Sequence, residues 1–559
     1  MKNHTYNSFN IIEIAQLINS FKKTVDLDGQ SLTIQEIFAV GRKKTKAAIH
    51  LDTKQSKRLK DSFQHMMSDI ENGVPVYGCN TGFGARASRV LVDGTKQERL
   101  KMAKMISEGI VHVDVTVGPK FDTDVVRAAM LIRANMLLKG VSAVKQPDIE
   151  KLISLLNHQI TPIVSQYGGI GASGDLAHNA RVLSALRQLS GTKVLDKQGK
   201  IVEAKKALKK AGITPLVLDP KAGLGFVNGD NFSSALTTFL VIDTINLLMI
   251  SFVLGAMVIE VLKGTDRSFH KLLENVRPHP GHAEAASIFR HLLNGSKLAY
   301  QEMSGHQLRP KGVKVQDGYS LRCLAQYQGI NIEKIKHNLD IITININSSS
   351  DNPLWVAPEF TNENEEPWQW VSGGNFIAMN MVEVADSTRK ILTQITKLND
   401  RHLARMVSPH ENNGLPANLS DKDAITQCAF KGIQIQSGMF DVYSSLLSIP
   451  VSTFFGVHEE GNQDITSHAL TSGILGLENL RVARYSCAQN LLAVAQAVDL
   501  RGGSHLLSSK TRPMYNFLRS KTNYVTREEP LGGMIEDLYQ SIVNGEMITH
   551  VMKEIYQTL

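Results

Sequence analysis

Three small residues, Ala172, Ser173 and Gly174, stand in a glycine-rich segment that runs from Tyr167 to Asp175 and leads into a predicted helix. Because Gly174 has no side chain, its amide nitrogen can approach the carbonyl carbon of Ala172 at little steric cost. Ring closure with loss of water, including dehydration of Ser173, would give a five-membered ring with an exocyclic methylene. No side chain is an electrophile of this kind, and reactions that need an electron sink usually import a cofactor. In isolation the tripeptide would be an ordinary turn; in this context it predicts an electrophile made from the backbone.

A second glycine-rich segment, Val76–Gly84, contains three glycines with Asn80 and Thr81 between them. This composition predicts a loop with unusual backbone angles. The loop carries a tyrosine, Tyr77, whose phenol is a candidate acid or base.

The two segments 168–176 and 76–84 resemble the signature segments of the aromatic amino acid ammonia-lyase family, which includes histidine, phenylalanine and tyrosine ammonia-lyases and related aminomutases. The resemblance implies a mainly α, ammonia-lyase-like fold and a 3,5-dihydro-5-methylidene-4-imidazolone (MIO) group formed autocatalytically from Ala172, Ser173 and Gly174. It also implies a homotetramer whose active sites take residues from three subunits, with no metal and no nucleotide cofactor. Similar motifs follow in the family's order at 227–229, 279–281, 315–323, 350–354, 373–376, 430–432 and 462–464.

The resemblance makes Tyr77 the base that removes the β-proton of the substrate. A free tyrosine has a pKa near 10, so its pKa must be lowered for this role at neutral pH. Positive surroundings or helix N-termini would lower it. The alternative is a loop tyrosine that only packs its ring.

Arg322 follows Tyr319 by three residues, so both lie on one face if the segment is helical. A guanidinium is the natural fork for a substrate carboxylate; the alternative for Arg322 is a structural ion pair. By resemblance, Tyr319 and Asn228 donate hydrogen bonds that stabilise developing charge, and Gln316 lines the same site.

Five further residues are expected at the site by resemblance. Phe376 is similar to the aromatic residue beside the prosthetic group, and Asn375 precedes it. Histidine ammonia-lyases carry a glutamate where this chain has Gln463 and lack a lysine corresponding to Lys431, so the pattern resembles the phenylalanine and tyrosine enzymes and the aminomutases. Glu459 would then receive the amino group and Lys431 would tune its charge; the alternative is a surface salt bridge.

The pair that selects the substrate ring has two possible positions. Counting back from the predicted helix 124–140 gives His112–Val113, which resembles the His-Leu pair of tyrosine enzymes; counting forward from Gly84 gives Met105–Ile106. The segment 117–119 resembles the family's sequence just after the pair, so we prefer His112–Val113. The chain departs from the family at 177–180, where His178 and Asn179 replace a Pro-Leu pair, and at Asp230, where Thr is common.

The predicted activity is that of a carbon–nitrogen lyase, an ammonia-lyase that converts an aromatic L-amino acid into an arylacrylate. Tyrosine is the favoured substrate and phenylalanine the next. The nearest alternative is an aromatic amino acid 2,3-aminomutase with the same MIO group, and the third is a histidine ammonia-lyase. A non-catalytic helical scaffold is the alternative from a different class.

The composition agrees with a globular protein that acts on a small molecule. The chain has 559 residues, of which 42% are hydrophobic, and a net charge of +8. The basic residues are spread out, with no nucleic-acid motif, so neither a nucleic acid nor a membrane is an expected partner. Four dispersed cysteines exclude a disulfide scaffold and favour a reducing compartment. Without a recognisable signal peptide, the expected location is the cytoplasm.

Helical periodicity dominates from residue 231 onward and predicts an elongated bundle with a smaller mixed α/β part before it. The most apolar stretch, Ala235–Leu262, contains Asp243, Asn246 and Glu260, so we interpret it as a buried bundle helix. Predicted long helices span 233–263, 283–295, 322–350, 376–406, 421–448, 466–499 and 533–557. The predicted parts are an extension at 1–25, the MIO-bearing domain at 26–230, the long-helix bundle at 231–525 and a C-terminal helical segment at 526–559.

Overall fold

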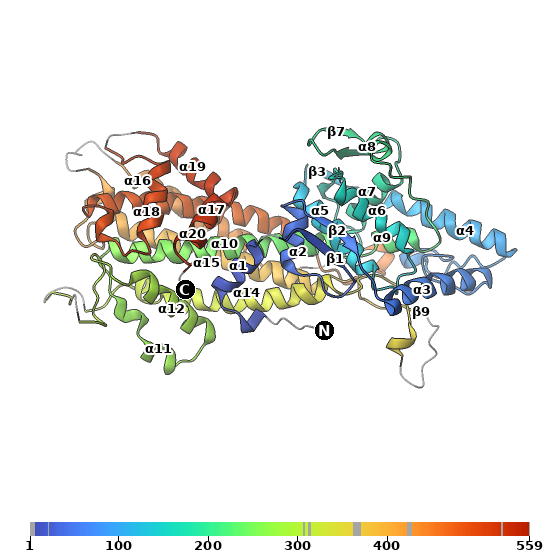
Figure 1. The fold of residues 1–559 in the computed structure, drawn as a ribbon, viewed down its shortest axis with the longest axis horizontal. Helices are drawn as coiled ribbons and strands as arrows, with labels where there is room; N and C mark the ends of the chain where they lie inside the picture. The colour runs from blue at the N-terminus through green and yellow to red at the C-terminus, as the bar shows by residue number, and fades with distance from the viewer. Residues whose placement is uncertain are drawn as a thin grey trace.

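The computed structural model describes residues 6–20, 22–305, 308–310, 315–361, 370–421, 428–454, 456–526 and 529–557. It is an elongated, mainly helical molecule, in which long helices lie side by side and a smaller part with short strands occupies one end (Figure 1). The predicted fold class is confirmed. The division into four parts remains a prediction.

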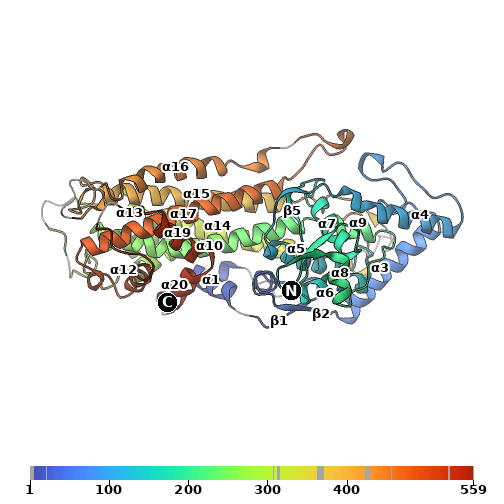
Figure 2. The same cartoon turned by 90° about the horizontal axis from the view of Figure 1, so that it is seen from above.

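The bundle is built around one almost fully buried helix. In α10 (Asn231–Val261) every residue except Asn246 is buried. A helix that is apolar on all sides must be covered on all sides. The chain is long and apolar enough over Ala222–Val261 to cross a membrane, judged by length and composition alone, but this stretch lies inside the bundle. Around α10 pack α12 (Pro280–Leu293), α14 (Leu324–Ile346), α15 (Met379–Val407) and α17 (Ala469–Leu500). A further helix, α16 (Lys431–Leu447), packs on α15 and α17, and these long helices run nearly parallel to the long axis (Figure 2).

The smaller end combines helices with short sheets. Its strands form a parallel pair, β1 (Thr24–Leu27) with β2 (Lys46–Ile49), and antiparallel sets: β3 (Val117–Lys120) with β5 (Ser165–Tyr167), β4 (Thr161–Pro162) with β6 (Lys193–Leu195) and β7 (Ile201–Glu203), and β8 (Leu354–Trp355) with β9 (Trp370–Val371). Its helices are α3 (Thr53–Glu71), α4 (Lys96–Gly109), α5 (Thr123–Leu137), α6 (Gln146–Asn157), α7 (Leu176–Leu186), α8 (Ala204–Lys210) and α9 (Ala222–Val227).

The remaining helices are short. They are α1 (Ile11–Asn19), α2 (Ile34–Gly41), α11 (Lys271–Asn275), α13 (Tyr319–Arg322), α18 (Arg512–Lys521), α19 (Gly532–Val543) and α20 (Glu546–Glu554). The single helix predicted over 533–557 is therefore wrong. It breaks at Gly545, whose φ of 80° is left-handed and ends a helix.

A buried ion cluster joins the smaller end to the bundle. Arg42, which follows α2, donates to both carboxylate oxygens of Asp243 in α10, at 2.6 and 2.9 Å. Arg484 of α17 lies 3.0 Å from the same carboxylate. Because this carboxylate has two cationic partners, its burial is compensated.

Candidate active site

The Ala-Ser-Gly segment forms a tight turn between β5 and α7. The amide of Gly174 donates to the carbonyl oxygen of Gly171 at 3.0 Å, and both glycines have left-handed φ angles of 85° and 77°. Ser173 inside the turn is completely buried. Such φ angles cost a glycine little, which explains why glycine stands at both positions.

One residue at the start of α10 and one just before α17 bind the turn. Asp175 accepts hydrogen bonds from the amide and hydroxyl of Ser233 in α10, at 2.8 and 2.7 Å. Ser467, which precedes α17, donates to the carbonyl oxygen of Ala172 at 3.2 Å. Burial raises the pKa of Asp175 to about 8.

The three residues fit an MIO group. Apart from its chain neighbours, no described atom lies within 4 Å of the place where a Cβ of Gly174 would stand, so the space on that side of the residue is open. The hydroxyl of Ser173 accepts a single long contact, 3.4 Å, from the Asp175 amide. The turn therefore supplies small residues, a buried serine and fixed ends, which are the features that ring closure needs.

The residues at the two ends of α9, Lys221 and Asn228, both contact Asp351. Lys221, with a left-handed φ of 64°, pairs with Asp351 at 2.5 Å, and both side chains are buried. The side-chain amide of Asn228 donates to the same Asp351 carboxylate at 3.1 Å. Lys221 and Ser467 were missed by the sequence reasoning. No signal marked them, whereas Asp351 lay in a motif that the resemblance had already identified.

Tyr77 lies at the same end, because its neighbour Gly78 is pressed against Leu224 of α9. The Gly84 amide donates to the Tyr77 hydroxyl at 2.9 Å, and the Phe83 ring meets the Tyr77 ring edge-on at 6.4 Å. The expected lowering of the Tyr77 pKa is wrong for the single chain. Burial and then the charge of Glu459 raise the pKa, and only the Gly84 hydrogen bond among the contributing contacts lowers it.

Glu459 reaches Tyr77 from the loop that follows α16. It lies so close to Gly84 that a Cβ there would collide with its carboxylate, and Asn462 donates to it at 2.9 Å. Gln463 follows in the same turn, where its backbone pairs with His458. Two of the three predicted subfamily residues, Glu459 and Gln463, therefore lie at the end that carries Tyr77.

Asn375 and Phe376 also belong to this end. The amide of Gly373, two residues earlier, donates to the side chain of Asn352 at 2.9 Å, and Asn352 adjoins the Asp351–Asn228 contact. Phe376 is half-buried and Asn375 exposed.

The two possible selectivity pairs occupy different surroundings. His112 and Val113 end a 3₁₀ turn, Ile110–Val113, that packs against α7, the helix that begins just after the Ala-Ser-Gly turn. The imidazole of His112 is exposed and Val113 contacts the core. Met105 is 56% exposed on α4. The geometry favours the His112–Val113 register, which stays a prediction.

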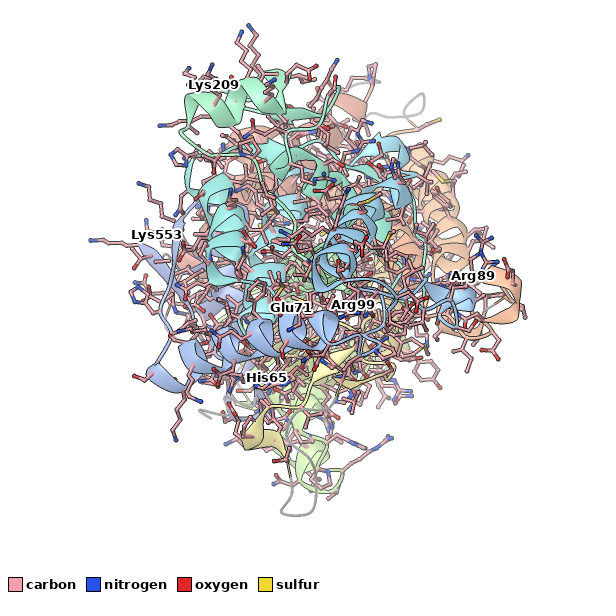
Figure 3. The ribbon with its side chains drawn as sticks, turned by 90° about the vertical axis from the view of Figure 1, so that its right-hand side faces the viewer. His65, Glu71, Arg89, Arg99, Lys209 and Lys553 are labelled. Atoms are coloured by element: carbon pink, nitrogen blue, oxygen red, sulfur yellow. The ribbon has the colours of Figure 1, made fainter. Side chains whose placement is uncertain are left out.

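Arg99 closes the segment that carries Tyr77. Its guanidinium donates to the carbonyl oxygens of Val92 at 3.2 Å, Gly94 at 2.7 Å and Glu71 at 3.1 Å. Figure 3 shows Arg99 beside Glu71 at this end of the molecule. The segment is therefore tied at its base to α3 and α4.

Tyr319 and Arg322 lie at the opposite end of the bundle. They form the short helix α13, so the condition under which both share one face is met, and the guanidinium stacks on the Tyr319 ring at 4.5 Å. Asp317, just before α13, accepts from Thr265 at 2.9 Å, beyond the far end of α10. Since α10 has 31 residues, it is about 46 Å long, and Ser233 beside the Ala-Ser-Gly turn lies in its first turn, at the other end.

Gln316 and Lys431 share this distant position. Gln316 is exposed beside α13, and Lys431 is exposed at the start of α16. The residue before Lys431, Phe430, bonds Asn418, and the adjacent Leu419 accepts from Gln496 near the far end of α17. Within one chain, Lys431 therefore does not meet Glu459, and the expected pairing of these two residues is wrong there.

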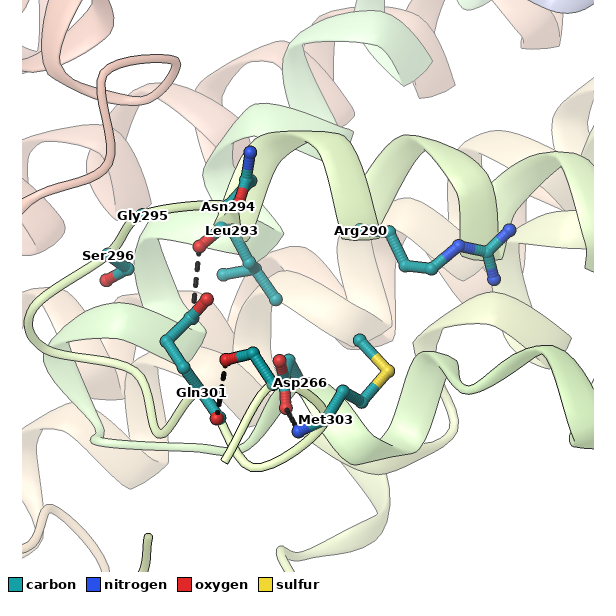
Figure 4. A pocket seen from close by; sticks show the side chains of 9 residues that line it. Asp266, Arg290, Leu293, Asn294, Gly295, Ser296, Gln301 and Met303 are labelled. Atoms are coloured by element: carbon teal, nitrogen blue, oxygen red, sulfur yellow. Dashed lines mark hydrogen bonds between the residues drawn. The ribbon is translucent and has the colours of Figure 1, made fainter. Parts of the chain in front are cut away.

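One cavity of the described residues lies elsewhere and does not contain this chemistry. It is a hollow of about 560 Å³ near the end of α12, lined in part by Asp266, Arg290 and Gln301 (Figure 4). Its polar groups are already engaged: Asp266 accepts from the Met303 amide at 3.1 Å and Arg290 pairs with Glu274 at 3.0 Å.

Comparison with known proteins decides the family. Residues 32–520 match the family model described as aromatic amino acid lyase. The chain belongs to this family. The expected enzyme of the carbon–nitrogen lyase class is confirmed at this level.

Three similar proteins illustrate the breadth of the family. The chain is 33% identical over 480 residues to a phenylalanine aminomutase of Talaromyces islandicus, covering 85% of this chain and 67% of the relative. It is 31% identical to a histidine ammonia-lyase of Alkaliphilus oremlandii, covering 95% and 99% of the two chains. The crystal structure of tyrosine aminomutase from Streptomyces globisporus superposes with a TM-score of 0.84 at 27% identity, covering 95% and 99%.

Proposed function

We propose that this member of the family is an MIO-dependent ammonia-lyase that acts on an aromatic L-amino acid, with tyrosine favoured and phenylalanine next, and releases an arylacrylate. The observation that carries the proposal is the Ala172–Gly174 turn, which is anchored at both sides and lies at the same end as Tyr77 and Asn228. The MIO group, once formed, supplies an electron-poor methylene that draws electrons from the bound substrate.

Tyr77 removes the β-proton in this proposal. The Gly84 amide favours the phenolate by donating to its oxygen, while burial and Glu459 favour the phenol. A cation is therefore required to shift the balance. Arg322 and Lys431 are the candidates, and each would have to come from another copy of the chain.

We propose a homotetramer with shared active sites for this reason. Tyr319 is 72% exposed, and the buried Nε atom of Arg322 has no hydrogen-bond partner among the residues that the structure describes. A second copy would supply Tyr319, Arg322 and Gln316 next to the Ala-Ser-Gly turn. An exposed apolar stripe on α16, spaced for one helix face, offers the contact surface and consists of Ile435, Met439, Val442 and Leu446.

The choice of substrate rests on His112 and on the subfamily residues. The exposed imidazole of His112 can bond the hydroxyl of a tyrosine ring. Glu459 is the proposed acceptor of the amino group, Gln463 lies in its turn, and Phe376 with Asn375 borders the ring. Gln463 and Lys431 disfavour histidine as substrate.

An aromatic 2,3-aminomutase is the second candidate, because both a phenylalanine and a tyrosine aminomutase are among the similar proteins. The two activities differ in whether ammonia returns to the β-carbon before the product leaves. Incubation with L-Tyr, L-Phe, L-His and L-DOPA tests the proposal: free arylacrylate supports the lyase, a β-amino acid supports the mutase, and turnover of L-His alone refutes both assignments.

The location proposed for this enzyme is the cytoplasm. Among the described residues, Cys79, Cys323 and Cys487 are free thiols, which agrees with a reducing compartment.

A further inference from the structure

The loop that contains the Ala-Ser-Gly turn is joined at its base by His178, in the first turn of α7. The Nε2–H of His178 donates to the carbonyl oxygen of Gln166 in β5, at 3.1 Å. Gln166 precedes the loop and His178 follows it. One side chain thus connects the strand that enters the loop with the helix that leaves it.

The imidazole is held in this position by packing. It is completely buried between Phe121 and Phe232, whose ring centroids lie 5.7 and 5.5 Å from its own. The second ring nitrogen, Nδ1, has no hydrogen-bond partner in the described part of the chain. Burial lowers the pKa of His178 to about 4, so the ring is neutral and carries its one proton on Nε2.

Neighbouring contacts hold the same two flanks. Arg181 of α7 pairs with Asp114 at 2.7 Å, and the nearby Thr116 is pressed against Gly168 at the start of the loop. β5 itself pairs with β3. His178 therefore completes a rigid frame around residues 168–175.

We propose that His178 is a positioning residue for ring closure: by fixing the distance between β5 and α7, it holds the loop in the compressed form in which Gly174 can attack Ala172. The inference rests on the proposed function. Fixing both ends of a short loop removes chain entropy before the reaction, and pre-paid entropy accelerates an intramolecular step.

The reaction so promoted needs no oxidant or reductant. A bond forms between the Gly174 nitrogen and the Ala172 carbonyl carbon, whose oxygen leaves as water. The Ser173 hydroxyl leaves as a second water. The four hydrogens of the two waters come from the Gly174 and Ser173 amides and from the Cα and hydroxyl of Ser173.

Three variants separate the hydrogen bond from the packing. His178→Phe keeps a ring between Phe121 and Phe232 but removes the donor, whereas His178→Gln keeps an N–H donor. His402 is a matched control. It too is buried, it donates from Nε2 to the carbonyl oxygen of Ser320 at 2.8 Å, and its Nδ1 lacks a partner within the described ranges. His402→Phe breaks the same kind of contact at the other end of the bundle.

The measurement is the fraction of full-length chains lacking two waters, followed by mass spectrometry of the residue 168–175 peptide during cell-free synthesis. We expect closure in His178→Phe to be about tenfold slower, the equivalent of one hydrogen bond. His178→Gln should recover most of the rate, and His402→Phe should match the wild type. Melting curves report whether each variant is folded.

The outcomes distinguish a failure of the proposed function from a failure of the positioning role of His178. If the wild type never loses two waters, both the proposed function and the role of His178 fail. If the wild type closes and folded His178→Phe closes equally fast, only the positioning role fails. It also fails if His402→Phe slows closure as much, because the effect would then be general destabilisation.

Discussion

Mixing two inactive variants tests whether active sites are shared between copies. Tyr77→Phe removes the proposed base at one end of the molecule, and Arg322→Ala removes the proposed carboxylate fork at the other. The ends are separated by about 46 Å of α10. No substrate-sized molecule spans this distance, so a working site must draw Tyr77 from one copy and Arg322 from another.

The expected recovery follows from counting. In tetramers assembled at random from equal amounts of the two variants, a site is complete when a chain with intact Tyr77 meets a chain with intact Arg322. Each condition holds for half of the chains, so about a quarter of wild-type activity should return. The assay is arylacrylate formation after co-expression of differently tagged chains and isolation of the mixed oligomers.

A pair from one end provides the control. Mixtures of Tyr77→Phe with Ser173→Ala should recover nothing, because both residues come from the same end of one chain. Absence of activity in mixed Tyr77→Phe and Arg322→Ala oligomers would refute the shared site, and recovery in the control pair would refute the placement of Tyr77 beside Ser173.

Three further predictions follow from named contacts. Glu459→Gln removes a charge that raises the Tyr77 pKa, so the rising limb of the kcat/KM profile should move to lower pH; an unmoved limb would mean that Tyr77 is not the base or does not sense Glu459. His112→Phe should lower the preference for L-Tyr over L-Phe by roughly tenfold, measured as a ratio of kcat/KM, while Met105→Ala leaves it unchanged. Asp243→Asn should destabilise the fold by about 3–5 kcal/mol in urea unfolding, since it leaves two partly buried arginines without their shared counter-charge. Burial alone would raise the pKa of Asp243, but Arg42 and Arg484 lower it to about 2. The wild type should therefore lose this stability as the pH falls from about 4 through 2. The Asn variant should show no such loss.

Local patterns predicted most of the helices, since their ends are set by neighbouring residues. One example is α3, which begins at a capping box of Asp52 with Gln55 and ends just before Gly73, whose φ of 76° is left-handed. The break at Gly545 was missed because the apolar helical period continues on both sides of it, although Asn544-Gly545 is the same helix-ending step as Asn72-Gly73.

The arrangement of the site was harder to predict, because it depends on which ends of long helices meet. The resemblance gathered Tyr77, Arg322 and Lys431 into one site, but periodicity carries no information on the direction in which a helix runs. Only the contacts of Asp317 with Thr265, and of Ser233 with Asp175, show that α10 holds these groups apart. Residues that act through a tertiary contact alone, such as Lys221, left no pattern to detect.

The distance between the two ends of the bundle also explains why the pKa of Tyr77 is raised in a single chain. In the single chain its surroundings favour the phenol, because burial and Glu459 outweigh one amide hydrogen bond. Arg322 and Lys431 are the cations that could lower the pKa of Tyr77. Both lie at the distant end, where Lys431 is exposed and the Nε atom of Arg322 has no hydrogen-bond partner among the described residues. The MIO group can form within one chain, whereas Tyr77 needs a cation from a second chain to act as the base. A dissociated subunit should therefore retain the mass deficit of two waters and lose turnover. A monomer that stayed fully active after dilution would show that Tyr77 does not need a cation from a second chain.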